Sequence, residues 1–277
     1  MSGPAFREPT GEELAKLERM LVTARVFGNG EEMRSAIAGE PWRIRTTDGG
    51  EVAVLSRWRD HLPVLAIDAL WCATSAIPCA VQALRRLGWS VGLSDMVSPP
   101  IPVEETGPYE AAGMRVHTVV ATFALAPLGA THVARNVRGL TIRRARKGDV
   151  PVVMRVDAAC FDSFWRYDRR HLERFCDTGR LALAEVDGMA VGYTLCTVDA
   201  DDGLLGRLCV VPGMRRRHIG SALLAEAVSF VGRAGGSRIT LSTQVDNQPS
   251  QALYRSASFS DTGRRYAFLR FGAEKGR

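Results

Sequence analysis

The chain has 277 residues, of which 46% are hydrophobic and 24% charged, and its formal net charge is +6. This length holds one large domain or two of ordinary size, with ample apolar material for a core. No apolar run approaches membrane-spanning length, and the polar, acidic start is unlike a secretory signal or a transit peptide. We therefore expect a cytoplasmic protein that does not enter a membrane.

The six cysteines, at positions 72, 79, 160, 176, 196 and 209, form no C-x-x-C pair and mostly have apolar neighbours. A disulfide framework or a structural zinc site needs paired spacings. We expect reduced cysteines and no metal.

Residues 1–127 are predicted to form a first α/β domain. Thr10 and Glu13 begin its first helix with a capping pattern, and Asp48-Gly49-Gly50 is typical of a hairpin turn. The remaining predicted elements are strands at 42–46, 51–57 and 62–72, a helix at 75–87, and strands at 89–97 and 115–125. Residues 128–138 lack periodicity and are predicted to be a linker.

Residues 139–277 are predicted to form a second α/β domain, in which Asp187-Gly188 joins two strands as a hairpin. The expected order is a strand at 140–144, helices from Asp149 and Asp168, strands at 181–186, 191–198 and 203–211, a helix at 221–233, a strand at 237–244, a helix at 248–256 and a final strand. This half carries 22 Arg and Lys against 15 Asp and Glu, a net +7, whereas residues 1–138 carry 14 against 15. The positive charge thus belongs to the second half.

The stretch from Cys209 to Leu224 joins an apolar strand to a helix through Pro212, Gly213 and three arginines. The first N–H groups of a helix have no intrahelical partner, and the helix dipole adds positive charge there. A phosphate is the guest that such a site favours. The Lys-Ser/Thr pair of a nucleoside-triphosphate loop and the G-x-G-x-x-G of a dinucleotide site are both missing.

This stretch resembles the acyl-coenzyme A signature of the GNAT N-acetyltransferase superfamily, Arg/Gln-x-x-Gly-x-Gly/Ala after a strand ending in Val-x-Pro. Arg215 takes the first position and Gly220 the last, but His218 replaces the first glycine. A second signature follows, with Asn247 after a strand and then Leu253-Tyr254 through Phe259, in which Ser258 replaces a glycine. Together the two signatures cover about half of the chain.

The resemblance implies an acetyl-coenzyme A-dependent enzyme with a mixed, mostly antiparallel sheet flanked by helices. It also implies a sheet that splays between the strand ending at Val211 and the next strand, which opens a slot for the pantetheine arm. Tyr254 would protonate the departing thiolate as the catalytic acid. The cofactor-binding residues that it implies are Leu208, Cys209, Val210, Val211, Arg215, Arg216, Arg217, His218, Ile219, Gly220, Ser221, Asn247 and Tyr254.

The first half repeats the order of elements of the second, down to a short helix ending in Tyr109-x-x-x-Gly113-Met114. We interpret residues 1–127 as a degenerate GNAT-like copy, and an unrelated α/β domain is the alternative. Residues 73–78 lack the arginines and glycine of the motif, so we expect the cofactor only on residues 139–277.

The acceptor is expected to be a primary amine, either a small molecule or a protein N-terminus, attacked within a ternary complex. The aromatic residues Phe164, Trp165 and Tyr167 are candidates for its pocket, and core packing is the other interpretation. Where some relatives carry a glutamate base, this chain has Ser242. The base stays open among four carboxylates, Asp162, Asp168, Glu185 and Asp246, and direct attack by a neutral amine.

Two further alternatives remain from sequence. The replacements at 218, 242 and 258 also fit a GNAT-fold binding or regulatory protein without catalysis. Nucleic acid suits the positive charge, but no recognition motif accompanies it, so we do not expect it as a partner. The oligomeric state cannot be read from the sequence.

Overall fold

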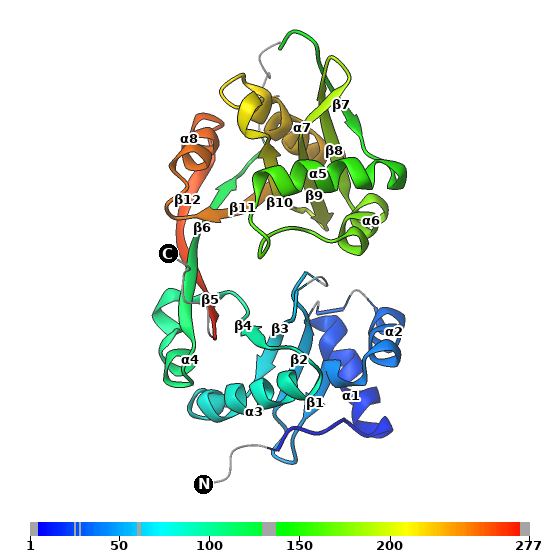
Figure 1. Cartoon of the computed structure of the whole chain (residues 1–277), viewed down its shortest axis with the longest axis vertical. Coiled ribbons are helices and arrows are strands. Elements are labelled where there is room, and N and C mark those ends of the chain that lie inside the picture. Colours follow the sequence, from blue (N-terminus) through cyan, green and yellow to red (C-terminus); the bar gives the residue numbers. More distant parts are fainter. Residues whose placement is uncertain (1–4, 25, 28, 60–61, 129–136, 272–277) are drawn as a thin grey trace. The chain divides into compact units, whose positions relative to one another are not determined.

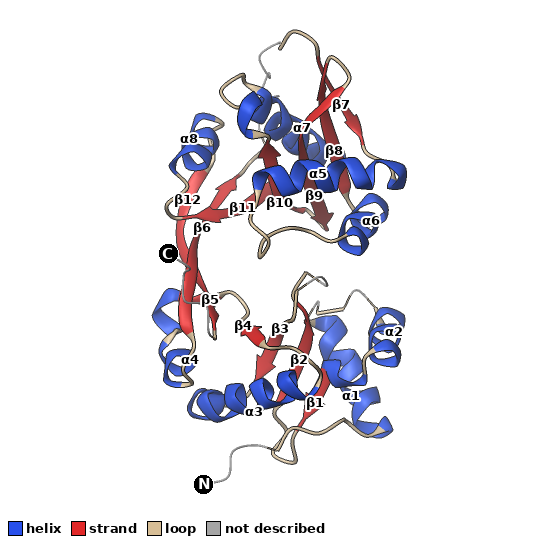
Figure 2. Cartoon of the chain, viewed as in Figure 1, coloured by secondary structure: helices blue, strands red, loops and turns tan. Residues whose placement is uncertain are grey.

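The computed structural model describes residues 5–24, 26–27, 29–59, 62–128 and 137–271. The chain forms two compact units (Figure 1), one of Met1–Val119 with Tyr266–Arg277 and the other of Val120–Arg265. In each unit, helices pack on a sheet, as the colouring of Figure 2 shows. Among the described residues, no helix has both the length and the apolar character needed to cross a bilayer.

The first unit has the sheet order β1-β2-β3-β4-β12, in which β3 and β4 are parallel and the other pairs antiparallel. Its core lies between this sheet and α3, with Leu65, Val81 and Leu84 fully buried. The elements are α1 (Gly11–Thr23), α2 (Gly30–Gly39), β1 (Ile44–Thr46), β2 (Val52–Arg57), β3 (Val64–Trp71), α3 (Ile77–Ser90), β4 (Asp95–Val97), β5 (Ile101–Pro102) and α4 (Gly107–Ala111).

The second unit has the order β6-β11-β10-β9-β8-β7, with one parallel pair, β10 and β11. Its elements are β6 (Arg115–Leu125), β7 (Leu140–Arg144), α5 (Val150–Cys160), α6 (Arg169–Thr178), β8 (Arg180–Val186), β9 (Met189–Asp199), β10 (Asp202–Val210), α7 (Ile219–Arg233), β11 (Arg238–Gln244), α8 (Gln248–Ser256) and β12 (Ser260–Arg270). Two of these strands are shared, because residues 115–119 of β6 and 266–270 of β12 belong to the first unit.

The two faces of the second sheet are covered by different helices. Because side chains alternate along a strand, Cys209 of β10 packs in one cluster with α5 and α6, and its neighbour Val210 packs in another with α7. Both clusters are apolar, which is why this sheet is buried on both faces at its centre.

The same hydrogen-bond pattern ends a helix in each half of the sequence. Met114 N–H donates to Tyr109 O (3.1 Å) after α4, and Phe259 N–H donates to Tyr254 O (3.0 Å) after α8. Both tyrosines are 6% exposed. Together with the parallel strand pair in each unit, this repetition supports the reading of the chain as two copies of one fold.

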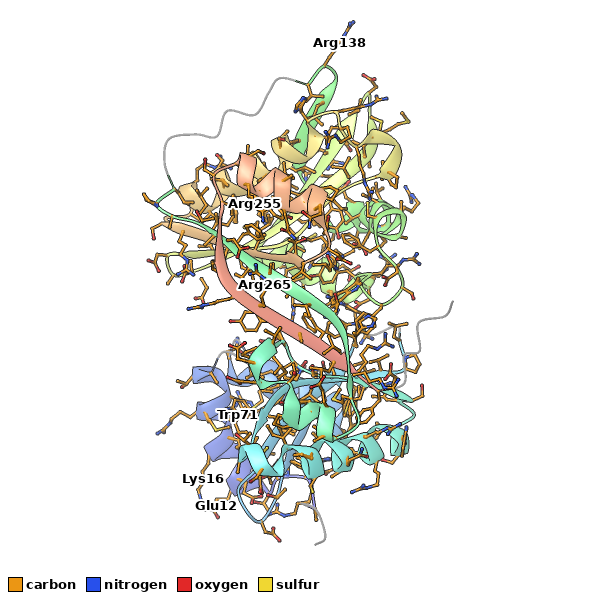
Figure 3. All side chains as sticks on the ribbon, turned by 90° about the vertical axis from the view of Figure 1, so that its left-hand side faces the viewer. Glu12, Lys16, Trp71, Arg138, Arg255 and Arg265 are labelled. Atoms are coloured by element: carbon orange, nitrogen blue, oxygen red, sulfur yellow. The ribbon has the colours of Figure 1, made fainter. Side chains whose placement is uncertain are left out.

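A left-handed residue ends both of these turns. It is Gly113 (φ 91°) in the first half and Ser258 (φ 64°) in the second. Beside the second turn, the guanidinium of Arg255, labelled in Figure 3, stacks over Phe123 at 5.5 Å.

The last strand of each half pairs outside its own half. β6, which follows α4, pairs with β11 from Val120↔Gln244 to Leu125↔Ile239, and β12 pairs with β4 and β5. The compact units therefore differ from the contiguous ranges 1–127 and 139–277 expected from the sequence. Most of the linker expected at 128–138 lies outside the described residues.

Three details of the first half differ from the sequence-based expectation. The strands expected at 42–46 and 89–97 are wrong at their starts, because Pro41–Arg43 forms a 3-10 turn before β1 and α3 continues to Ser90 before β4. α2 was not predicted; Asn29 caps it by accepting a hydrogen bond from Glu32 N–H (2.8 Å).

Candidate functional site

The sheet of the second unit opens between its two parallel strands. β10 and β11 pair from Asp202↔Arg238 to Leu205↔Leu241, and this pairing stops there although β10 continues to Val210. A register shift between Leu205 and Arg207 marks a bulge at the same point. A bulge bends a strand and ends regular pairing, so the edge of β10 from Leu208 to Val210 is left facing the opening. This is the opening expected from the resemblance.

The turn after β10 contains two non-glycine residues in left-handed conformations, Arg216 (φ 63°) and His218 (φ 60°). His218 is the N-cap of α7, and its side chain makes no capping bond. The superfamily signature has glycine here, and glycine is the residue that adopts this conformation without steric cost. His218 therefore fits the turn at the expense of backbone strain, and its side chain is exposed.

Arg215 is held beside the N-terminus of α7. Its Nε donates to Val210 O at 3.0 Å, which fixes the guanidinium over the end of β10. The N–H groups of Ile219, Gly220 and Ser221 lie in the first turn of the helix, where no intrahelical acceptor exists. A fixed cation beside free N–H donors is an arrangement that binds phosphate.

A cavity of about 680 Å³ joins the opened strand edge to this turn. It lies within the second unit, and its size is in the range of small-molecule sites. Among the described residues, those lining it are Cys160, Phe161, Leu208, Cys209, Val210, Met214, Arg215, Arg216, His218, Ile219, Gly220, Ser221, Asn247, Pro249, Ser250, Ala252, Leu253 and Ser256.

Most of the cofactor-binding residues expected from the sequence line this cavity. Of that set, Val211, Arg217 and Tyr254 are not among the lining residues. Asn247 is present, and its side chain also caps α8 by accepting from Ser250 N–H (3.2 Å). The amide nitrogen of Asn247 remains the group with which it would bind a pantetheine carbonyl.

The contribution of Cys160 and Phe161 to the cavity wall was not predicted from the sequence. Cys160 ends α5 and Phe161 follows it, about 50 positions before Arg215. Only the packing of α5 against β9 and β10 brings them there, so neither motif could have indicated them. On the α8 side, Asn247 was expected to bind the cofactor, whereas the lining residues Pro249 and Leu253 were not.

Tyr254 is a residue of α8, and its side chain is buried in an apolar cluster. Its ring packs against Phe123 and Phe259, with centroid distances of 6.0 and 6.1 Å. Burial raises the pKa of its phenol to about 12, and a hydrogen bond with Ser250 opposes that shift. Ser250 lines the cavity, so the hydroxyl of Tyr254 reaches the cavity wall through this contact.

The three aromatic residues expected at the acceptor pocket do not line the cavity. Phe164 is buried and packs edge-on against Trp165 at 5.0 Å, and Tyr167 packs edge-on against Phe175 at 5.8 Å. The structure thus supports the interpretation that this cluster covers the core. Phe161, at the start of the same segment, is the aromatic residue that reaches the cavity.

A buried charged pair holds this aromatic segment on the sheet. Arg207 Nη2 donates to Trp165 O (2.8 Å), and its guanidinium lies 4.0 Å from the Phe161 ring centroid and 4.2 Å from that of Tyr167. Asp157 accepts from Tyr193 OH (2.6 Å) and from Tyr167 N–H (2.9 Å). The wall at Phe161 is therefore fixed by polar contacts from α5, β9 and β10.

None of the candidate carboxylates lines the cavity among the residues that the structure describes. Asp162 accepts from Phe164 N–H, Asp168 caps α6, and Glu185 pairs with Arg143 at 2.9 Å. Asp246 is exposed. Ser242, at the position of the glutamate base of some relatives, is 3.3 Å from the Thr122 hydroxyl on β6. These contacts give Asp162, Asp168 and Glu185 structural roles.

Residues 151–259 match the Acetyltransferase (GNAT) family. Over these residues the second half of the chain is similar to GNAT acetyltransferases. Part of the chain is 36% identical over 95 residues to the mycothiol acetyltransferase of Clavibacter sepedonicus, covering 34% of this chain and 31% of that protein. It spans only about a third of the length of this relative.

A second relative is matched over most of its own length. The putative [ribosomal protein bS18]-alanine N-acetyltransferase of Bacillus subtilis is 26% identical over 123 residues, which cover 44% of this chain and 82% of that protein. Both alignments are shorter than half of this chain.

Solved structures share the fold over nearly the whole chain. A GCN5-related N-acetyltransferase from Sphaerobacter thermophilus superposes with a TM-score of 0.63 and 17% identity, covering 96% of this chain and 94% of that one. A tandem GNAT protein from the clavulanic acid biosynthesis pathway gives 0.61 at 16% identity, covering 84% and 82%. The mixed, mostly antiparallel tandem GNAT fold expected from the sequence is confirmed.

Proposed function

We propose that residues 139–277 catalyse transfer of the acetyl group of acetyl-coenzyme A to a primary amine. One observation carries the proposal: a single cavity joins the unpaired edge of β10 to the N-terminus of α7. An extended amide arm needs free strand groups, and a pyrophosphate needs N–H donors beside a cation. Both line the same cavity.

Acetyl-coenzyme A, when bound, supplies an activated acetyl thioester. The chain would hold the pantetheine arm with the main-chain groups of Leu208 to Val210 and the amide of Asn247. Arg215 and the first N–H groups of α7 would hold the pyrophosphate. N–H groups on the edge of β10 would also stabilise the oxyanion that develops on the thioester carbonyl.

No carboxylate reaches the cavity among the described residues, which favours attack by an amine that is already neutral, with water taking up its proton. Tyr254 stays our candidate for the proton donor to the thiolate, on the strength of its contact with Ser250. The rate should then rise with pH up to the pKa of the acceptor amine.

The acceptor class is proposed as either a small amine or a protein N-terminus. One relative is named for the small molecule mycothiol and another for the alanine of a ribosomal protein. The experiment measures turnover of acetyl-coenzyme A with a panel of small amines and peptides that have free N-termini. Released coenzyme A is quantified by chromatography, because the cysteines of the protein would react with thiol dyes.

A GNAT-fold binding or regulatory protein is the second candidate. The strained His218 and the Ser242–Thr122 contact favour it, since both stand where active relatives carry other residues. Acetyl-coenzyme A that binds but is not consumed with any amine would support this candidate against the first.

A further inference from the structure

Two thiols and a guanidinium meet in the wall of the cavity. Cys160 ends α5, Cys209 lies on β10, and Arg215 begins the phosphate-binding turn; all three line the same space. Cys160 packs against the apolar cluster that contains Cys209. The guanidinium of Arg215 is anchored on Val210 O at 3.0 Å, one residue beyond Cys209.

These surroundings shift the pKa values of the two thiols in opposite directions. A hydrogen bond from Cys209 lowers the pKa of the Cys160 thiol, and the charge of Arg215 lowers it further, against the opposing effect of burial. Burial raises the pKa of Cys209 well above its usual value. Cys160 is partly exposed and Cys209 buried, so the accessible thiol is also the one whose thiolate is stabilised.

The remaining described cysteines lack this setting. Burial raises the pKa values of Cys72, Cys176 and Cys196, the last to about 12. Cys79 is exposed on α3, outside the cavity lining. It provides an internal control for reactivity that depends on access alone.

We propose that Cys160 is a modification site, at which an anionic low-molecular-weight disulfide reacts inside the cavity to leave one of its halves covalently bound. The Cys160 sulfur attacks one sulfur of the disulfide, a new S–S bond forms and the old one breaks. The other half leaves as a thiolate and takes up the proton that Cys160 released. No further oxidant is consumed.

The anionic class follows from the position of Arg215 and the N–H groups of α7, which attract the charged part of the reagent to the same space. Cys209 stays protonated and buried, so it resolves the mixed disulfide slowly and the adduct persists. The attached group fills the cavity beside Leu208 and Gly220. Modification would therefore exclude any other ligand of the cavity until a thiol reduces it.

The test treats the reduced full-length protein with coenzyme A disulfide, or with uncharged hydroxyethyl disulfide, and follows each cysteine by peptide mass spectrometry. We expect Cys160 to react several-fold faster than Cys79 with the anionic reagent, and to lose most of this advantage with the uncharged one. Cys209→Ala and Arg215→Ala should each slow Cys160 and leave Cys79 unchanged.

Reaction of Cys160 no faster than that of Cys79 with coenzyme A disulfide would overturn the proposal, as would equal preference for the two reagents. In Cys160→Ser with an unchanged melting temperature, ligand binding should survive treatment with the disulfide, because the blocked binding arises from the adduct at Cys160. The test measures modification of each cysteine and does not depend on acetyl transfer. If Cys160 reacts as expected in a protein that turns over no amine, the modification site stands and the proposed enzymatic function fails.

Discussion

The guanidinium of Arg207 lies 3.6 Å from the Asp157 carboxylate, and the two side chains are only 8% and 1% exposed. The pair lies between α5 and β10, and each member also bonds the segment from Phe161 to Tyr167. Two buried charges are tolerated because each satisfies the other and because the remaining polar atoms have partners. The pair thereby positions the wall that Cys160 and Phe161 give to the cavity.

Asp157→Asn should destabilise the protein strongly, because it leaves the Arg207 charge buried without a counter-charge. Breaking such a pair costs about 3 to 5 kcal/mol of the free energy of unfolding. Urea denaturation measures it, with Asp177→Asn as control, since Asp177 pairs with Lys147 at the surface. The control should change by less than about 1 kcal/mol. Equal effects of the two substitutions would show that the buried pair contributes no more to the free energy of unfolding than a surface pair does.

His218→Gly should stabilise the protein, because glycine adopts the observed φ of 60° without steric cost. The expected gain is about 1 kcal/mol in the free energy of unfolding, from relief of left-handed strain. Arg217→Gly is the matched control. Its neighbouring position is not among those with positive φ, so the same change there should destabilise. A loss of stability in both variants would mean that the turn carries no strain at residue 218.

Acid should remove a specific part of the stability at the start of α5. Two hydrogen bonds from Arg143 at 2.9 Å hold the pKa of Asp149 at about 2, below its ordinary 3.8. The stabilising contribution is therefore complete above 3.8 and disappears as the pH falls toward 2. In Arg143→Gln, the deficit in urea midpoint relative to the wild type should shrink over this range. A deficit that stays constant down to the lowest pH would contradict the assignment.

Tyr254→Phe separates the proposed proton donor from a packing residue. If the hydroxyl protonates the thiolate, kcat should fall by about 10²-fold or more, the range of general acids, while affinity for acetyl-coenzyme A changes little. Phenylalanine keeps the contacts with Phe123 and Phe259, so the melting temperature reports whether packing was preserved. Unchanged kcat would leave Tyr254 as a core residue, and an equal loss of turnover and affinity would also count against the acid role.

The elements near the turn between β10 and α7 could be predicted from the sequence because their signals are local. The hairpin at Asp187-Gly188, the break at Pro212-Gly213 and the cap at Asn247 each act within a few residues. Two of the three departures from the superfamily pattern, His218 and Ser258, fall at left-handed positions. The pattern indicates glycine there for backbone reasons, which the sequence alone did not reveal.

The pairing of β6 with β11 and of β12 with β4 could not be predicted. Both strands show the same alternation of apolar and polar residues, and each pairs with a strand more than 100 residues away. The acceptor side stays a prediction for a related reason. In the sequence, Trp165 and Tyr167 fit a binding surface and core packing equally well. Their contacts with Arg207 and Asp157, which are distant from each other along the chain, could not be predicted. Charged residues buried in pairs give no periodic signal.

The most direct test of the central claim is calorimetric titration of the protein with acetyl-coenzyme A, beside Arg215→Ala and Arg217→Ala. The two variants lose the same charge from the same turn, but only Arg215 lines the cavity. We predict micromolar binding to the wild type, a loss of about tenfold or more in Arg215→Ala from the removed charged hydrogen bonds, and a smaller loss in Arg217→Ala. No binding by the wild type, or equal weakening by both variants, would contradict the assignment of the cavity.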